Sequence, residues 1–117
     1  MYDKELENLV HSKYLFERVE AVKQGYGLDV LINDKESCIR LLIAEQGYGL
    51  DVLVHDDDFV IRQTVAYHGY GLDILVHDTN PLVRLAVAKQ GYGLDVLIND
   101  ENWAVCDEVE RQLGKFS

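Results

Sequence analysis

The sequence predicts an all-α solenoid of five 22-residue repeats, each a short helix followed by a longer one. The tripeptide Gly-Tyr-Gly begins at Gly25, Gly47, Gly69 and Gly91, always 22 residues apart, and a leucine follows every copy. Within the repeats, apolar residues recur four positions apart, which is the spacing of one helix face. Because a fixed period of about 20 to 50 residues is the signature of repeat architectures, residues 1–117 are expected to form one repeat domain.

The repeat accounts for nearly the whole chain. Counting back 22 residues from Leu28 reaches Leu6, which opens a degenerate first copy. The units are residues 6–27, 28–49, 50–71, 72–93 and 94–115, with five residues before them and two after. No stretch is left over for a second domain.

The first helix of each unit is short. It is expected over residues 28–32 and their equivalents, α-helical or partly 3₁₀ because it is barely longer than one turn. Gly27 can cap its start, and Asp29 lies in the first turn, where the positive end of a helix favours a carboxylate.

The second helix is longer and has clear start and stop signals, best seen in the fourth unit. Asn80 can cap its start, and Pro81 then occupies the first helical position, which needs no amide donor. The helix is expected to stop at Gly91, because glycine readily takes the left-handed conformation that ends helices.

Helices of this length are not stable alone in water, so their stability must come from stacking. In the long helices, apolar pairs spaced i, i+4 form one stripe, and alanines beside them allow close approach. These residues are Ile39, Ile43 and Ala44, Ile61, Val65 and Ala66, and Val83, Val87 and Ala88. Together with Leu28, Leu31, Ile32 and their equivalents, they are expected to form a continuous core.

The chain is acidic. It has 21 acidic and 11 basic side chains, for a formal net charge of −10 with histidine neutral. This sign opposes contact with a phosphate backbone, so nucleic acid is not an expected partner. No apolar run approaches the roughly 18 residues of a membrane span, and the first residues lack signal-peptide features. We therefore expect no membrane contact and a cytoplasmic location.

An aspartate precedes an arginine by six residues in three units. The pairs are Asp34 with Arg40, Asp56 with Arg62, and Asp78 with Arg84. The aspartate can accept from backbone amides at the long-helix start, while the guanidinium can reach a carboxylate of its own or the next unit. We interpret the pairs as a structural ladder rather than a ligand site. Ser12 replaces the aspartate in the first unit and Cys106 replaces the arginine in the last, as expected where a ladder ends.

The repeat pattern Val-Arg-x-x-Val-Ala-x-x-Gly, followed by Leu-Asp-x-Leu-Val-x-Asp, resembles the leucine-rich repeat variant family and, more broadly, HEAT-like repeats. The residues that carry the resemblance are Val83-Arg84-Leu85-Ala86-Val87-Ala88 and Leu94-Asp95-Val96-Leu97-Ile98-Asn99-Asp100, with their equivalents in the two preceding units. The resemblance covers nearly the whole chain. It implies a right-handed superhelix of paired short helices that serves as a protein-binding surface. Some members carry an iron–sulfur cluster, but two cysteines cannot supply four thiolates, so no cofactor is expected here.

Histidines and cysteines suggest no reactive site. His11, His55 and His77 share one column with two asparagines, and since both residue types tolerate positive φ, we expect a helix-ending role. Units about 8–10 Å apart cannot close around an ion bound at about 2 Å, so no metal site is expected.

Cys38 and Cys106 lie three units apart and are expected to be free thiols. No nucleophile with a paired base and no phosphate-binding motif is present, so no catalytic residue is assigned and no enzymatic activity is expected.

The tyrosines of the Gly-Tyr-Gly tripeptides have two possible uses. These residues are Tyr26, Tyr48, Tyr70 and Tyr92. Each ring either packs between successive units as a spacer, or projects from the surface as an anchor of the kind that binding sites favour. The sequence leaves both open.

Three columns of the long helices, spaced i, i+4, i+8, vary freely between copies and include many apolar residues. We expect this face to line the concave wall and bind another protein. The candidate residues are Leu41, Phe59, Gln63, Tyr67, Leu85, Lys89 and Trp103. Ordinary scattered surface apolars are the competing explanation.

The acidity has a second interpretation. The Asp56-Asp57-Asp58 run and the aspartate columns are explained by helix capping repeated five times, or they form a rod of carboxylates that imitates nucleic acid and inhibits a basic protein site.

At the C-terminal end, Leu113 and Phe116 either cover the final core or are exposed and allow self-association through a terminal repeat.

Overall fold

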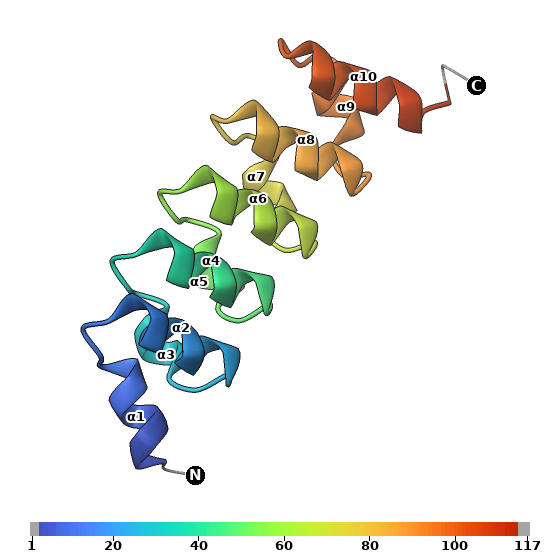
Figure 1. Ribbon diagram of the computed structural model, residues 1–117. Helices are drawn as coiled ribbons and strands as arrows, with labels where there is room; N and C mark the ends of the chain where they lie inside the picture. The colour runs from blue at the N-terminus through green and yellow to red at the C-terminus, as the bar shows by residue number, and fades with distance from the viewer. Residues whose placement is uncertain (1–2, 115–117) are drawn as a thin grey trace.

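The computed structural model describes residues 3–114, and all regular structure in this range is helical. Ten helices within these residues follow one another along a rod with principal extents of 56 × 22 × 20 Å. Helix α1 lies at one end of the rod, and α9 and α10 lie at the other (Figure 1). The chain is therefore elongated, with neighbours in space that are mostly neighbours in sequence, as in a helical repeat protein.

Long and short helices alternate along the rod. The long helices are α2 (Leu15–Lys23), α4 (Ser37–Glu45), α6 (Phe59–Tyr67), α8 (Pro81–Lys89) and α10 (Trp103–Gln112). The others are α1 (Lys4–Val10), α3 (Leu28–Leu31), α5 (Leu50–Leu53), α7 (Leu72–Leu75) and α9 (Leu94–Leu97). Each long helix packs beside the next long helix (Figure 1). The one-turn helices α3, α5, α7 and α9 connect each long helix to the next, and we call each long helix, with the loop that precedes it and the short helix that follows it, one level of the rod.

The short helices begin at a glycine for a steric reason. Gly71 has φ of 65° at the start of α7, and a Cβ placed on it would lie 2.6 Å from a Val54 methyl carbon of the preceding level. A side chain at this position would be strained by both the backbone and the contact. The helix itself is α-helical, as the bond from the Leu75 amide to the Gly71 carbonyl shows. Bonds of the i→i−3 type close only its ends.

The start and stop signals of the long helices act as the sequence predicts. Asn80 accepts a hydrogen bond from the Leu82 amide at 2.8 Å, and Pro81 occupies the first turn of α8. Gly91 follows the helix with φ of 76°, and its amide donates to the Ala88 carbonyl. These caps fix the helix ends, which places the side chains of successive long helices in register.

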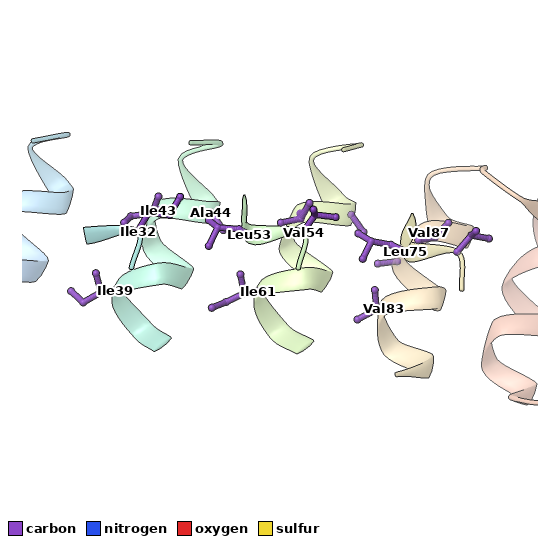
Figure 2. Close-up of a cluster of buried hydrophobic side chains, with 14 of the residues drawn as sticks. Ile32, Ile39, Ile43, Ala44, Leu53, Val54, Ile61, Leu75, Val83 and Val87 are labelled. Atoms are coloured by element: carbon purple, nitrogen blue, oxygen red, sulfur yellow. The ribbon is translucent and has the colours of Figure 1, made fainter. Parts of the chain in front are cut away.

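One hydrophobic core runs the length of the rod. Ile39 and Ile43, Ile61 and Val65, and Val83 and Val87 are fully buried, as the i, i+4 pattern predicts. Leucines from the short helices interleave with them, so that Leu53 and Leu75 lie between neighbouring levels (Figure 2). Because burial of one such side chain contributes about 1.5–3 kcal/mol, stacking supplies the stability that each short helix lacks alone.

One expectation changes at the level of individual residues, and one open alternative is decided for Leu113. The histidine and asparagine column does not end helices through positive φ, because among residues 3–114 only glycines have positive φ. His55 and Asn33 instead donate their backbone amides to carbonyls three residues earlier. At the C-terminal end Leu113 is exposed, while the expectation for Phe116 lies outside the described residues.

Candidate interaction surfaces

Arginines of successive long helices bind aspartates of the following level. Arg62 shows the geometry: its Nε and Nη2 donate to the two carboxylate oxygens of Asp78 at 2.8 and 3.1 Å. The same paired contacts join Arg18 to Asp34, Arg40 to Asp56 and Arg84 to Asp100. The partner of each arginine is thus the aspartate 16 residues later, one level along the rod. Each of these four bidentate pairs joins one level to the level that follows it.

Each ladder arginine also donates to the backbone carbonyl six residues earlier, which belongs to an aspartate for Arg40, Arg62 and Arg84 and to Ser12 for Arg18. Arg62 Nη1 donates to the Asp56 carbonyl oxygen at 2.8 Å, and the Asp56 carboxylate in turn accepts from the Asp58 amide at 3.0 Å. At the last level Cys106 replaces the arginine, and its thiol donates to the Asp100 carbonyl. The carboxylate of every ladder aspartate therefore accepts from an amide of its own loop and from the arginine of the preceding long helix.

The ladder is largely shielded from water. Its arginine side chains are 10–16% exposed and its aspartates 7–10%. Hydrogen bonding to Asp56 raises the pKa of Arg40 above its ordinary value, against the effect of burial. Burial alone would raise the pKa of Asp56, but hydrogen bonds from Arg40 and the Asp58 amide outweigh it and lower that pKa. Both groups are charged at neutral pH, and the pair stays salt-bridged.

A second set of contacts joins the far ends of the long helices. Gln46 Nε2 donates to the Val22 carbonyl oxygen at 2.7 Å, and Gln112 Nε2 donates to that of Ala88 at 2.6 Å. Each glutamine adds a second donor to a carbonyl in the last turn of the preceding long helix, which also accepts from the amide of the glycine that follows that helix. These contacts join α2 to α4 and α8 to α10, so these two pairs of long helices are held by the ladder at one end and by a glutamine at the other.

The predicted partner-binding residues fall into two groups. Tyr67, Lys89 and Trp103 are exposed, with Tyr67 at 46% and Trp103 at 79%. Leu41, Phe59 and Leu85 are half-buried and pack against the core, and Gln63 is half-buried beside them. The first group is available to a partner, whereas the second also stabilises the stack.

The long helices expose a further apolar column that the sequence analysis missed. It contains Phe16, Val60 and Leu82, which occupy the second position of α2, α6 and α8 and are exposed. A helical wheel centred on the buried stripe would have found them, since this position lies opposite the core. Added to Tyr67 and Trp103, these residues make the outer face of the long helices more apolar than predicted.

The short helices present another regular surface. Tyr48, Tyr70 and Tyr92 are 41–42% exposed, and Val30, Val52, Ile74 and Val96 are 46–51% exposed. These near-identical values show that each level repeats one environment. Tyr26 differs because it is half-buried and its hydroxyl donates to Glu7. The tyrosines of the later levels are therefore surface features rather than buried spacers.

A hollow of about 480 Å³ lies between α3 and α5 on this surface. Ile32 and Val52 contribute apolar side chains, Tyr48 an aromatic ring, and Asp29 and Asp51 carboxylates. The two aspartates are exposed and make no ion pair within residues 3–114. The same residue types recur at the next two levels, with histidine in place of Asn33.

Among the described residues, no three His, Cys, Asp or Glu side chains are grouped to hold a metal ion. No helix in residues 3–114 has the length and apolar character to cross a membrane. Comparisons with protein-family models, curated proteins and solved structures found no significant match.

Proposed function

We propose that this chain is a right-handed solenoid of five 22-residue units, similar to leucine-rich repeat variant and HEAT-like proteins, that binds another protein in the cytoplasm without catalysing a reaction. The supporting observation is the row of exposed apolar side chains on consecutive long helices. Val60, Tyr67, Leu82 and Trp103 are all exposed. Exposed apolar side chains that gather on one face are typical of interaction sites in soluble proteins.

The packing of the long helices supports the same proposal. The ladder between Arg62 and Asp78 and the shared core hold α6 against the next level, which supports the presentation of the exposed residues in one geometry before a partner arrives. Little conformational entropy is then lost when the complex forms. Tyrosine and tryptophan are also the residues most enriched at the centres of binding energy in protein interfaces.

The experiment compares two triple variants in affinity purification from the native cell, with mass spectrometry as the readout. The first variant, Val60→Ser, Tyr67→Ala and Leu82→Ser, removes exposed apolar groups from the long helices only. The second, Val52→Ser, Tyr70→Ala and Ile74→Ser, makes matched changes on the short helices. We expect the first variant to lose a partner that wild type and the second variant retain. Retention of every partner by the first variant contradicts the proposed binding face.

The alternative proposal is an acidic inhibitor that imitates nucleic acid. Four of its carboxylates, those of the ladder, are already neutralised by arginines, so mimicry would depend on the remaining exposed ones. Salt dependence separates the two functions. Steep weakening of the complex as ionic strength rises favours mimicry, whereas weak salt dependence favours the apolar face.

Self-association through the C-terminal repeat is a further part of the proposal. Trp103 is the most exposed aromatic residue described, and Leu113 at the end of α10 is half-exposed. Sedimentation equilibrium of wild type and a Trp103→Ser, Leu113→Ser variant tests it. A dimer in wild type that the variant abolishes supports this contact, and a monomer at all concentrations contradicts it.

A further inference from the structure

The three central long helices expose the same two positions. Helices α4, α6 and α8 lie side by side along the rod (Figure 1). Seven residues make about two helical turns, so the second and ninth residues of each helix lie on one stripe, away from the buried stripe. These exposed residues are Cys38 and Glu45 in α4, Val60 and Tyr67 in α6, and Leu82 and Lys89 in α8. We call the three stripes together the central face.

The central face carries one negative and one positive charge. Although the chain has 21 acidic side chains, α6 and α8 contain no aspartate or glutamate. Glu45 and Lys89 occupy the ninth position of α4 and α8, one level on either side of Tyr67. Both are exposed, and neither makes an ion pair within residues 3–114. Opposite charges therefore flank an exposed aromatic ring at equal separation in levels.

This distribution is complementary to itself. If two copies meet face to face about a two-fold axis that runs parallel to α6, the α4 helix of one copy lies opposite α8 of the other. The facing helices then run in the same direction, so each ninth position faces a ninth position. Glu45 of each copy faces Lys89 of the other, while Val60 and Tyr67 meet their own equivalents near the axis. A symmetric interface of this kind requires one surface that matches itself.

The other face-to-face arrangement is poorly matched. With the two-fold axis along the rod, each long helix would face its own equivalent in the reverse direction. Glu45 would then lie opposite Cys38, and Lys89 opposite Leu82. Both charges would lose water without gaining an opposite charge, which costs free energy. The charges of the central face therefore select the first arrangement.

The ends of the rod do not favour stacking of one copy on another. Successive levels are joined by an arginine that binds an aspartate of the following level. To continue this ladder into a second copy, the last level would need the arginine and the first level the aspartate. Ser12 stands at the aspartate position and Cys106 at the arginine position. The ladder thus ends within the chain, which favours a lateral contact over an end-to-end one.

From these observations we infer that the central face binds a second copy of this chain, with Glu45 of each copy paired with Lys89 of the other. The inference rests on the proposed role of the long helices as a binding surface and names one partner for that surface. It uses different residues from the C-terminal contact of Trp103 and Leu113 proposed above.

The experiment reverses each charge in turn. Glu45→Lys and Lys89→Glu each create two like-charge contacts per dimer, and the double variant restores two opposite-charge contacts. Sedimentation equilibrium of the full chain at about 1–300 µM measures the dimer dissociation constant. We expect wild type to dimerise, each single variant to weaken the dimer about ten-fold or more, and the double variant to lie within about three-fold of wild type.

A mixture of the two single variants tests the register. A dimer of one Glu45→Lys chain with one Lys89→Glu chain has opposite charges across both of its pairs. We expect the equimolar mixture to dimerise nearly as well as wild type, although each variant alone does so weakly. The controls are Lys35→Glu and Glu101→Lys, which make the same changes of charge in exposed loops. They should alter the dissociation constant less than about two-fold.

Three results would overturn the inference. The first is a wild-type chain that stays monomeric over the whole concentration range, and the second is a mixture that dimerises no better than its components. The third is a dimer that the charge reversals leave unchanged and that Trp103→Ser with Leu113→Ser abolishes. In each case the long-helix proposal is still judged by its own experiment, because binding of a different protein does not require that the face match itself.

Discussion

Replacing Arg62 by methionine removes one contact of the ladder in the middle of the stack and keeps an apolar stem of similar length. Arg62 makes three hydrogen bonds, two to the Asp78 carboxylate and one to the Asp56 carbonyl oxygen. The Asp78 side chain is only 9% exposed. Without Arg62 it keeps one hydrogen bond, from the Asn80 amide, and its charge is left uncompensated.

The expected cost follows from this burial. Removing one partner of a buried ion pair destabilises a protein by about 3–5 kcal/mol, and a hydrogen bond to a charged group contributes about 1.5–3 kcal/mol. Arg62 is 16% exposed, so some water reaches the pair and the lower half of the range applies. We expect Arg62→Met to lower the free energy of unfolding by about 3–4 kcal/mol.

Urea unfolding at neutral pH, followed by far-ultraviolet circular dichroism, measures this change. The control is Arg111→Met, because Arg111 is 61% exposed and, among residues 3–114, pairs with Asp107 and Glu108 of its own helix. Because the Arg111 guanidinium is open to water on this helix surface, its pairs are expected to contribute about 0.2–1 kcal/mol, although Glu108 itself is only 12% exposed. Arg62→Lys keeps the charge but loses the bidentate geometry, so it should fall between the two and remain folded if the methionine variant does not.

A small difference between the variants would refute the ladder as a source of stability. If Arg62→Met and Arg111→Met lower the unfolding free energy by the same amount, the contacts seen between levels carry no more energy than surface pairs. A double-mutant cycle with Asp78→Asn isolates the pair itself. Additive effects of Arg62→Met and Asp78→Asn would lead to the same conclusion.

The remaining predictions concern pH, backbone and core. The pKa of Asp56 is lowered in the folded chain, so its stabilisation is complete above the unfolded value of about 3.9 and is lost as pH falls through the folded value. Asp56→Asn should therefore flatten the fall in urea-unfolding free energy below about pH 5, and an unchanged slope contradicts this. Gly71→Ala should lower the melting temperature more than Gly69→Ala, because both have positive φ but only the Cβ of the former would clash, at 2.6 Å from a Val54 methyl carbon, whereas the Cβ of the latter would lie 3.9 Å from Gln90 Oε1. Leu53→Ala should cost about 2–5 kcal/mol in urea unfolding and its exposed neighbour Val52→Ala less than about 0.5, and similar costs would disprove the assigned core.

Much of the fold was predictable because the five copies of the repeat can be compared with one another, position by position. Ile61 and Val65 are buried at the spacing that the pattern predicts, and Asn80 and Pro81 start α8 as expected. Local rules sufficed for these features, since capping and helical periodicity depend on a few neighbouring residues. The sequence did not determine the handedness of the rod beyond what the family resemblance implies.

The contacts between levels were harder to predict. Arg62 lies six residues after one aspartate and 16 before another, and spacing alone does not tell which carboxylate it reaches. The exposure of Tyr70 was also open, because a residue between two glycines can face either the core or the solvent. Val60 and Val52 look like core residues by composition, and only the packing of the levels places them at the surface.

Small-angle X-ray scattering tests the central claim most directly, because a stack of short helix pairs and a compact bundle of the same length differ in size. The Cα radius of gyration of the structure is 17.2 Å. A compact domain of this length has a value of about 13 Å. The account predicts a measured radius near 17 Å for the monomer, with an elongated distance distribution. A value near 13 Å with a symmetric distribution would contradict the stacked arrangement and every surface assigned from it.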